Sequence, residues 1–144
     1  VPEGDHIVPL GKADIKRAGG DVTIICHSKT VAPALNAAKL LSDEGIDAEV
    51  IDLRTIRPLD EAAILESVTK TNRCVVAEEG WSFAGVGAQV VDLIQREAFN
   101  DLDAPILRVT QADVPMPYNK HLEKAAKADA GKISAAVRRV CYKD

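Results

Sequence analysis

The sequence predicts an α/β fold, a three-layer α/β/α sandwich in which helices cover both faces of one sheet. Two observations lead to this prediction. Short apolar runs alternate with longer stretches whose apolar residues recur at helical spacing, and the connections between them are short. Three of the apolar runs are nearly continuous, which is typical of parallel strands covered on both faces. The 144 residues fit one domain.

The first expected element is a strand at the edge of the sheet, over residues 12–17 (KADIKR). Charged and apolar residues alternate there, as in a half-exposed strand that runs antiparallel to its neighbours. Gly19 and Gly20 follow it, and a glycine pair after a strand is typical of a hairpin. The residues alone therefore predict that the first strand pairs with the second.

The other strands are expected at four apolar runs rich in β-branched residues. These runs are residues 22–27 (VTIICH), 48–53 (AEVIDL), 74–79 (CVVAEE) and 106–110 (ILRVT). Apolar stripes at helical spacing predict helices over about residues 31–41, 60–68, 86–94 and 133–140. Gly45 is well placed to end the first helix, and Asp60, shortly after Pro58, is a good N-cap for the second.

Composition and charge exclude several classes of partner. The net charge is −4, from 18 basic and 22 acidic residues, so nothing indicates binding to nucleic acid or to an anionic membrane. A basic partner is mildly favoured instead. No apolar run approaches the length of a membrane span, and no signal-peptide pattern opens the chain. Val1 opens the chain and Met116 is its sole methionine, so we expect a processed chain or a piece of a longer one.

The cysteines indicate reduced thiols. Cys26, Cys74 and Cys141 are widely spaced, odd in number and form no CxxC pair. Cys26 and Cys74 lie inside apolar runs, so we expect buried thiols in a reducing compartment, with neither a disulfide framework nor a metal site.

The stretch EEGWSFAGVGA, residues 78–88, looks at first like a phosphate-binding loop between a strand and a helix. Gly85 and Gly87 supply the first two glycines of a dinucleotide fingerprint, but Val90 occupies the third position. Glu78 and Glu79 come just before the loop and would repel a diphosphate. We therefore expect these glycines to permit a special turn and close packing of helix on sheet.

Charged side chains gather where the expected strands end, which is where ligands bind in sheets of this kind. Arg54 and Arg57, in RTIRPLD, have the charge to hold an anion, but we favour ion pairs between them and Glu78 and Glu79 across the same edge. His27 is expected to be a hydrogen-bonded residue at the end of its strand.

Two more places have both a structural and a functional interpretation. Trp81 and Phe83 lie in a loop rich in glycine and serine, where exposed aromatic side chains would indicate a protein interface and buried ones a cap on the core. Asp101 and Asp103, in FNDLDAPI, fit a solvated acidic loop with a turn ahead of Pro105.

Five segments together resemble one known family. They are IVPLGKADIKRAGGDVTIICHS, EVIDLRTIRPLDEAAILESVTKTN, VVAEEGWSFAGVGAQ, FNDLDAPILRVTQADVPMPY and HLEKA. In this order they resemble the C-terminal domain of pyruvate dehydrogenase beta subunits, and more broadly the transketolase C-terminal domain. Asn119, where an alanine is usual, and the tail after Lys124 depart from the pattern. The resemblance implies a mixed five-stranded sheet with an antiparallel first strand and strand order 1-3-2-4-5, which conflicts with the hairpin at Gly19.

The resemblance also implies a division of labour within an enzyme that oxidatively decarboxylates pyruvate and acetylates the lipoyl group of its transacetylase. Thiamine diphosphate and magnesium bind between the alpha subunit and an N-terminal domain of the beta subunit, which also supplies the activating glutamate and the catalytic histidine. We therefore expect no catalytic, cofactor-binding or metal residue in this chain. Residues 1–6 are expected to be a linker from that N-terminal domain, and residues 7–144 the C-terminal domain, which is not catalytic alone.

The partners that the resemblance implies are the alpha subunit, a second beta subunit and the basic subunit-binding domain of the dihydrolipoyl transacetylase. Asp103, Asp101 and the C-terminal Asp144 are the expected docking residues, and Trp81 and Phe83 the expected subunit interface. A branched-chain 2-oxo acid or acetoin dehydrogenase beta subunit stays an alternative, as does a free-standing nucleotide-binding α/β domain. The expected compartment is a bacterial cytoplasm, with the mitochondrial matrix as the alternative.

Overall fold

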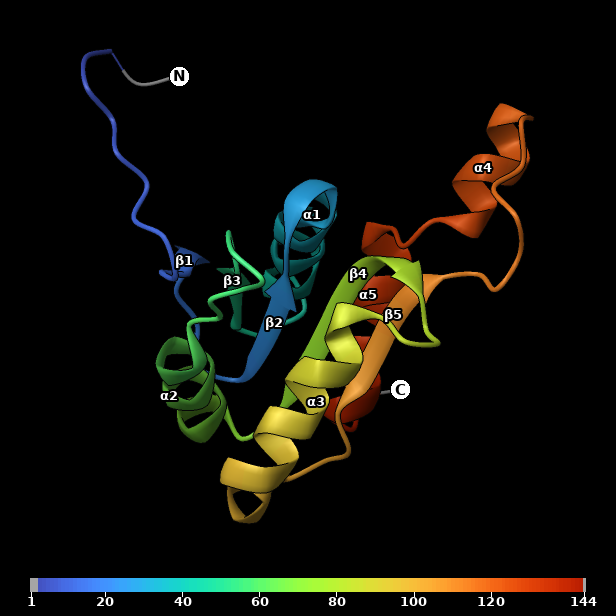
Figure 1. The fold of residues 1–144 in the computed structure, drawn as a ribbon. Coiled ribbons are helices and arrows are strands. Elements are labelled where there is room, and N and C mark those ends of the chain that lie inside the picture. Colours follow the sequence, from blue (N-terminus) through green and yellow to red (C-terminus); the bar gives the residue numbers. More distant parts are fainter. Residues whose placement is uncertain (1–2, 144) are drawn as a thin grey trace.

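The computed structural model describes residues 3–143, and within that range five strands form one mixed sheet (Figure 1). The strands are β1 (Asp14–Arg17), β2 (Val22–Cys26), β3 (Ala48–Asp52), β4 (Cys74–Trp81) and β5 (Leu107–Gln111). Their order across the sheet is β1-β3-β2-β4-β5; β1 is antiparallel to β3, and the other neighbouring pairs are parallel. The predicted sheet, with its antiparallel first strand, is confirmed.

Helices cover both faces of this sheet. The α-helices are α1 (Val31–Ser42), α2 (Glu61–Thr71), α3 (Val86–Glu97), α4 (Lys120–Ala126) and α5 (Ala130–Val140), and two 3₁₀ turns are η1 (Ser28–Thr30) and η2 (Phe99–Asp101). The buried side chains of α1 and α5 belong to one core cluster, and those of α2 and α3 to a second cluster on the opposite face. The three-layer sandwich predicted from the alternation of strands and helices is therefore confirmed.

The predicted hairpin between the first two strands is wrong. β1 pairs with β3, where Ile15 lies opposite Ile51, and the chain then crosses the start of β3 to reach β2. Gly19 permits this crossing, because a Cβ there would lie 2.4 Å from the carbonyl carbon of Ala48. The backbone N–H groups of Gly20 and Asp21 both donate to the Asp47 carbonyl, at 3.0 and 2.9 Å. The glycine pair thus serves close backbone contact rather than a tight turn.

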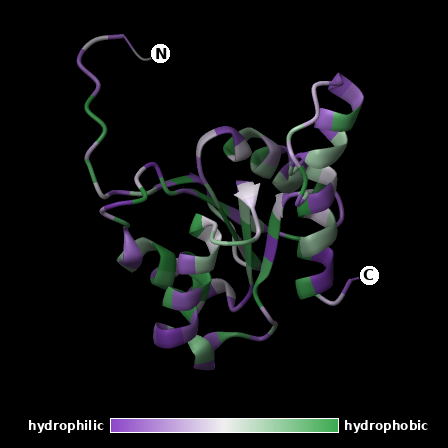
Figure 2. Ribbon diagram, turned by 45° about the vertical axis from the view of Figure 1, so that its right-hand side comes forward, coloured by the Kyte–Doolittle hydropathy of each residue, from purple (hydrophilic) through white to green (hydrophobic). Residues whose placement is uncertain are grey.

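The strands in the middle of the sheet are buried along most of their length, as their continuous apolar runs predict. All five residues of β2 are buried, and so are the first four of β3 and the first five of β4. Figure 2 shows apolar residues concentrated on the strands and on the helix faces that pack against them. Burial on both faces leaves only the ends and edges of the sheet for contact with other molecules.

Two helix boundaries follow the predicted signals. The Asp60 carboxylate accepts a hydrogen bond from the Ala63 N–H at 3.4 Å and so caps the start of α2. Gly45 takes a φ of +73° just after α1, and the N–H of the next residue, Ile46, closes back on the Leu41 carbonyl at 2.9 Å.

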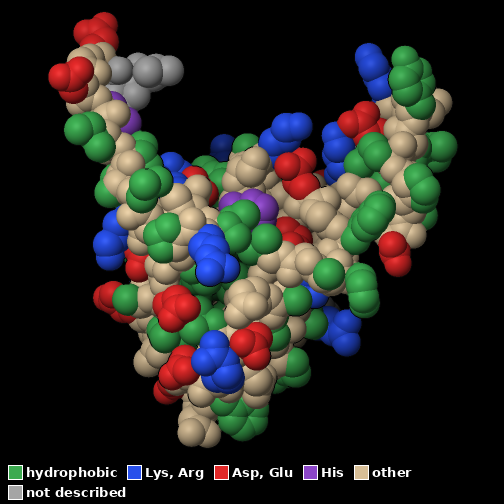
Figure 3. Space-filling view, viewed as in Figure 1, with side chains coloured by type: hydrophobic (Ala, Val, Ile, Leu, Met, Phe, Trp, Pro, Cys, Tyr) green, Lys and Arg blue, Asp and Glu red, His purple; other side chains and the backbone are tan. Residues whose placement is uncertain are grey.

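Two segments project from the body on the side where the parallel strands end. Residues 3–13 hold no strand or helix, and the loop from β5 carries α4 away from the sheet (Figure 1). The space-filling view shows apolar side chains on both projections (Figure 3). Among them, Ile7, Leu10, Tyr118 and Leu122 are exposed. The sequence patterns do not predict α4, a short helix that Asn119 caps by accepting from the N–H of His121.

Candidate functional site

The glycine turn after β4 holds a carboxylate that belongs to the chain itself. Glu78 is 2% exposed, and its Oε2 accepts the Gly87 N–H at 3.0 Å at the start of α3. Arg108 on β5 donates to the other oxygen, Oε1, at 2.5 Å. A Cβ on Gly85 or Gly87 would come within 2.7 or 2.5 Å of that carboxylate. The glycines therefore make room for Glu78, and the carboxylate sits where a nucleotide phosphate would need to bind.

Arg54 and Arg57 do not form the predicted pairs with Glu78 and Glu79. Arg54 instead reaches Asp14 on β1 at 2.6 Å, while Arg108 takes the place beside Glu78. The sheet order explains the difference, because β2 lies between β3 and β4 and keeps these side chains apart. No described salt bridge joins either arginine to either glutamate.

His27 is held through its backbone more than through its imidazole. The His27 carbonyl accepts a hydrogen bond from the Thr30 hydroxyl at 2.7 Å. The His27 N–H donates to the oxygen of the same Thr30 hydroxyl at 3.3 Å. Nε2 is buried and has no hydrogen-bond partner among the described residues. The predicted hydrogen-bonded strand end is therefore confirmed for the backbone but not for that ring nitrogen.

The cysteines are free thiols, as predicted. Cys26 and Cys74 are buried, and Cys141 is partly exposed. Burial raises the pKa of the Cys26 thiol to about 12 and also raises the pKa of Cys74 and of Cys141, so these thiols resist ionisation. Residues 3–143 contain no group of three or more His, Cys, Asp or Glu side chains that could hold a metal ion. Within the same range, no helix is long and apolar enough to cross a membrane.

Trp81 and Phe83 lie on the surface, at 50% and 86% exposure. Trp81 is the last residue of β4 and not, as expected, part of the loop; its Nε1 donates to the Val114 carbonyl at 3.2 Å and so ties the end of β4 to the segment that leads to α4. Val114 and Met116 in that segment are exposed as well. Both side chains are exposed, so neither of them caps the core.

Asp103 lies at the surface below β5, with its side chain 55% exposed. Arg73 Nη2 donates to its carboxylate at 3.0 Å. Its backbone is fixed twice, because the Asp103 N–H donates to the Asn72 carbonyl and the Tyr142 hydroxyl donates to the Asp103 carbonyl. Asp101 is partly buried, and Asp144 lies outside the described residues. The carboxylate is thus held in place and still reachable.

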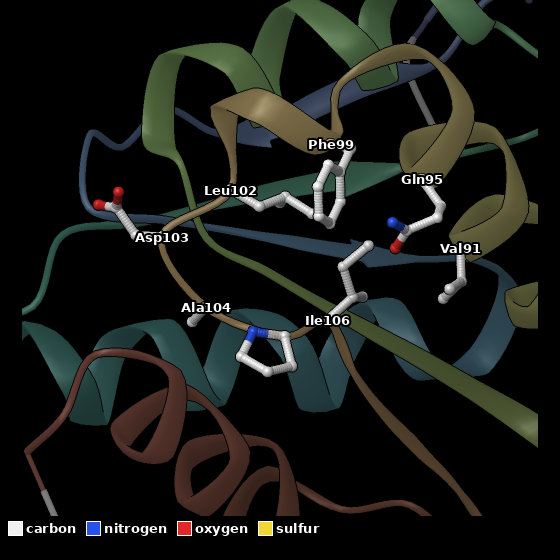
Figure 4. A pocket seen from close by; sticks show the side chains of 8 residues that line it. Val91, Gln95, Phe99, Leu102, Asp103, Ala104 and Ile106 are labelled. Atoms are coloured by element: carbon white, nitrogen blue, oxygen red, sulfur yellow. The ribbon is translucent and has the colours of Figure 1, made fainter.

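An apolar hollow of about 450 Å³ opens beside Asp103 (Figure 4). Its walls come from α3, from η2 and from the segment between η2 and β5, and they include Val91, Phe99, Leu102 and Ile106. Figure 4 shows Asp103 at one end of this hollow with its carboxylate turned outward. An apolar surface beside a fixed carboxylate suits a protein partner that presents an apolar side chain and a cation.

Sequence reasoning missed the Glu78–Arg108 pair. The available signal was a carboxylate that ends a buried strand directly ahead of a glycine turn, together with an arginine inside the next apolar run. Strand order, which places β5 beside β4, was needed to join them.

Comparison with known proteins gives consistent matches. The model of the transketolase C-terminal domain family matches residues 11–133. The chain is 51% identical over 142 residues to the pyruvate dehydrogenase E1 component subunit beta of Rickettsia felis, covering 99% of this chain and 44% of that protein. It is 48% identical over 140 residues to the mitochondrial subunit beta of Dictyostelium discoideum, covering 97% and 39%.

A solved structure agrees with these matches. It is described as a split gene transketolase in an inactive beta4 tetramer, and it superposes with a TM-score of 0.83 at 30% identity, covering 96% of this chain and 44% of that one. The chain thus spans less than half the length of each of these relatives.

Proposed function

The chain belongs to the transketolase C-terminal domain family, and from this we propose that it is the assembly and partner-docking domain of a pyruvate dehydrogenase beta subunit. The observation that carries the proposal is the 51% identity that extends over 99% of the chain. The proposal divides the chain into a linker at residues 1–6 and the domain at residues 7–144.

The proposed enzyme oxidatively decarboxylates pyruvate with thiamine diphosphate and magnesium and acetylates the lipoyl group of a transacetylase. The cofactors are held by the part of the enzyme that lies outside this chain, which supplies no catalytic residue. The glycine turn supports this division, because its helix N-terminus is already paired with Glu78. The relatives come from a bacterium and from mitochondria, so a bacterial cytoplasm is proposed, with the mitochondrial matrix as the alternative.

Three protein partners are proposed. The alpha subunit and a second beta subunit complete the enzyme, and the exposed Trp81 and Phe83 contact the second beta subunit. The beta4 tetramer named for the split gene transketolase shows that copies of that relative associate, which supports this contact. The transacetylase subunit-binding domain docks at Asp103, with help from Asp101 and Asp144. The fixed carboxylate and the apolar hollow beside it support this docking site.

A domain exchange tests the proposed function. The matching segment of the Rickettsia felis beta subunit is replaced by this chain, and the chimera is produced together with its alpha subunit. We expect an assembled enzyme that decarboxylates pyruvate, measured with an artificial electron acceptor. The same beta subunit truncated before the segment is the control, and it should fail to assemble.

The isolated chain is the second arm of the same experiment. Calorimetric titration with thiamine diphosphate and magnesium should show no saturable binding. Micromolar binding to the isolated chain, or a folded chimera that does not assemble, would overturn the proposed function.

A further inference from the structure

The two exposed aromatic side chains are Trp81, the last residue of β4, and Phe83, in the short loop between β4 and α3, which is fixed at several points. Ala84, inside the loop, takes a φ of +54°, a conformation that non-glycine residues adopt only when their surroundings hold them there. Such a loop does not keep its shape through local propensity, so the contacts that hold it decide how Trp81 and Phe83 are presented.

Glu78 and Arg108 supply two of these contacts, one at each end of the loop. The Glu78 carboxylate receives the Gly87 N–H at 3.0 Å, where α3 begins. Arg108, bound to the same carboxylate at 2.5 Å, uses its Nη1 to donate to the carbonyl of Ser82, the first residue of the loop, at 2.8 Å. One ion pair, whose carboxylate is buried, thus fixes both the start of the loop and its exit into the helix.

Exposed apolar side chains lie on both segments that meet here. The Trp81 Nε1–Val114 carbonyl hydrogen bond joins the end of β4 to the segment after β5. We call the exposed side chains of Trp81, Phe83, Val114 and Met116 the aromatic ledge. Large apolar and aromatic side chains of this kind suit the core of a protein interface.

We propose that the Glu78–Arg108 pair is a positioning latch that presets the aromatic ledge for contact with a second copy of this chain. The proposal rests on the proposed function, which places a second beta subunit at Trp81 and Phe83. A second copy is the chosen occupant because the ledge is apolar and the solved relative is described as a beta4 tetramer. A loop that is already ordered loses less conformational entropy when a partner binds, which favours association.

The experiment uses Trp81, the single tryptophan of the chain, as a reporter. Glu78→Gln keeps the size of the side chain but removes its charge and so the ion pair, and its single amide oxygen can accept from Arg108 or from the Gly87 N–H but not from both in the present arrangement. Because Trp81 is 50% exposed, its release should raise acrylamide quenching by up to about twofold. Hydrogen exchange over residues 80–88 should become faster, and sedimentation should show self-association weakened by about tenfold.

Two further variants separate positioning from general stability. Arg108→Lys keeps the charge but loses the donor to the Ser82 carbonyl, so exchange should rise at residues 82–84 and stay slow at Gly87. Glu79→Gln, at the neighbouring carboxylate, is the matched control and should behave like the parent chain. Far-ultraviolet circular dichroism at the working temperature checks that each variant is folded. If Glu78→Gln does not fold, the results for Arg108→Lys test the positioning role of the ion pair.

The possible results separate the positioning role of the ion pair from the role of the aromatic ledge in self-association. Unchanged quenching and exchange in the folded Glu78 and Arg108 variants would contradict the proposal that this pair positions the loop. A loosened loop with unchanged self-association would overturn the role of the ledge in the contact. If the parent chain does not associate at all, the proposed contact with a second beta subunit fails, and quenching and exchange still decide whether the pair holds the loop.

Discussion

At the scale of single residues, Asp103 shows how a docking carboxylate is kept ready. Arg73 already binds it, so a basic partner has to share or displace an existing ion pair. Asp103 is 55% exposed and Arg73 28%, so solvent partly screens the pair, which lowers the cost of the exchange. The backbone contacts to Asn72 and Tyr142 hold the carboxylate in position meanwhile.

We predict that Asp103→Asn in the assembled enzyme weakens transacetylase binding and leaves decarboxylation with an artificial acceptor intact. The loss of binding free energy is up to roughly 2–5 kcal/mol if the carboxylate is hydrogen-bonded within the interface, and it is smaller if the carboxylate lies at the rim of the interface. Titration calorimetry at low and high salt measures it. Asp101→Asn is the matched control and should lose less. Unchanged affinity of the Asp103 variant at low salt would make this residue an ordinary surface acid.

The site residues were predictable from sequence to different degrees. The sequence left open whether Trp81 and Phe83 are exposed, whereas the role of the glycines follows from the carboxylates beside them. Ion-pair partners did not follow. Arg54 was assigned to the wrong carboxylates because its partner depends on which strands are neighbours, and residue types alone do not contain that information.

At the scale of elements, α2 is joined to the edge of the sheet by its cap. Asp60 uses Oδ1 for the Ala63 N–H and Oδ2 for the Ala13 N–H at 3.0 Å, just ahead of β1. One side chain therefore starts the helix and fixes the approach to the first strand.

We expect Asp60→Ala to lower the free energy of unfolding by about 1–2 kcal/mol, because a buried cap and a tie to β1 are lost together. Asp60→Asn retains an acceptor and should cost less. Urea denaturation of both variants measures the difference, with Glu61→Ala, at the exposed position that follows, as the control. Equal stability of the Ala variant and the parent would show that the cap contributes nothing.

Element types were more predictable than element pairing. Each strand has an apolar run or an alternating pattern, and each long helix has an apolar stripe, but α4 is short and largely exposed, so no stripe marks it. The hairpin prediction failed because a glycine pair permits both a tight turn and a close crossing of another strand, and only the tertiary contact with Ala48 distinguishes them.

At the scale of the whole molecule, a buried polar network at the start of the parallel strands links stability to pH. Glu49 is 1% exposed and accepts hydrogen bonds from Lys70, Ser67 and the Gly19 N–H. Burial by itself would raise the pKa of Glu49, but the hydrogen bonds from Lys70, Ser67 and Gly19 hold it below its ordinary value. The folded state therefore binds this proton less readily than the unfolded chain.

It follows that Glu49 contributes stability above the unfolded pKa of about 4.3 and loses it as the pH falls through the lower folded value. We predict that Glu49→Gln lowers the melting temperature at pH 7 and narrows the difference in stability between pH 7 and pH 3.5. Calorimetric melting at several pH values measures this. Glu66→Gln, at an exposed position on α2, serves as the control, and an unaltered pH profile in the Glu49 variant would contradict the linkage.

The crossing of residues 18–21 over the start of β3 also sets an order of events during synthesis. β1 leaves the ribosome before the other four strands of this sheet, yet its partner β3 is made only after β2 and α1. Until then the first strand has no edge to pair with, and unpaired strands are prone to aggregate in a nascent chain. Asp14, Lys16 and Arg17 give this strand a charge at three of its four positions. The same charges that make β1 unsuited to the interior of the sheet oppose its aggregation until β3 has been made.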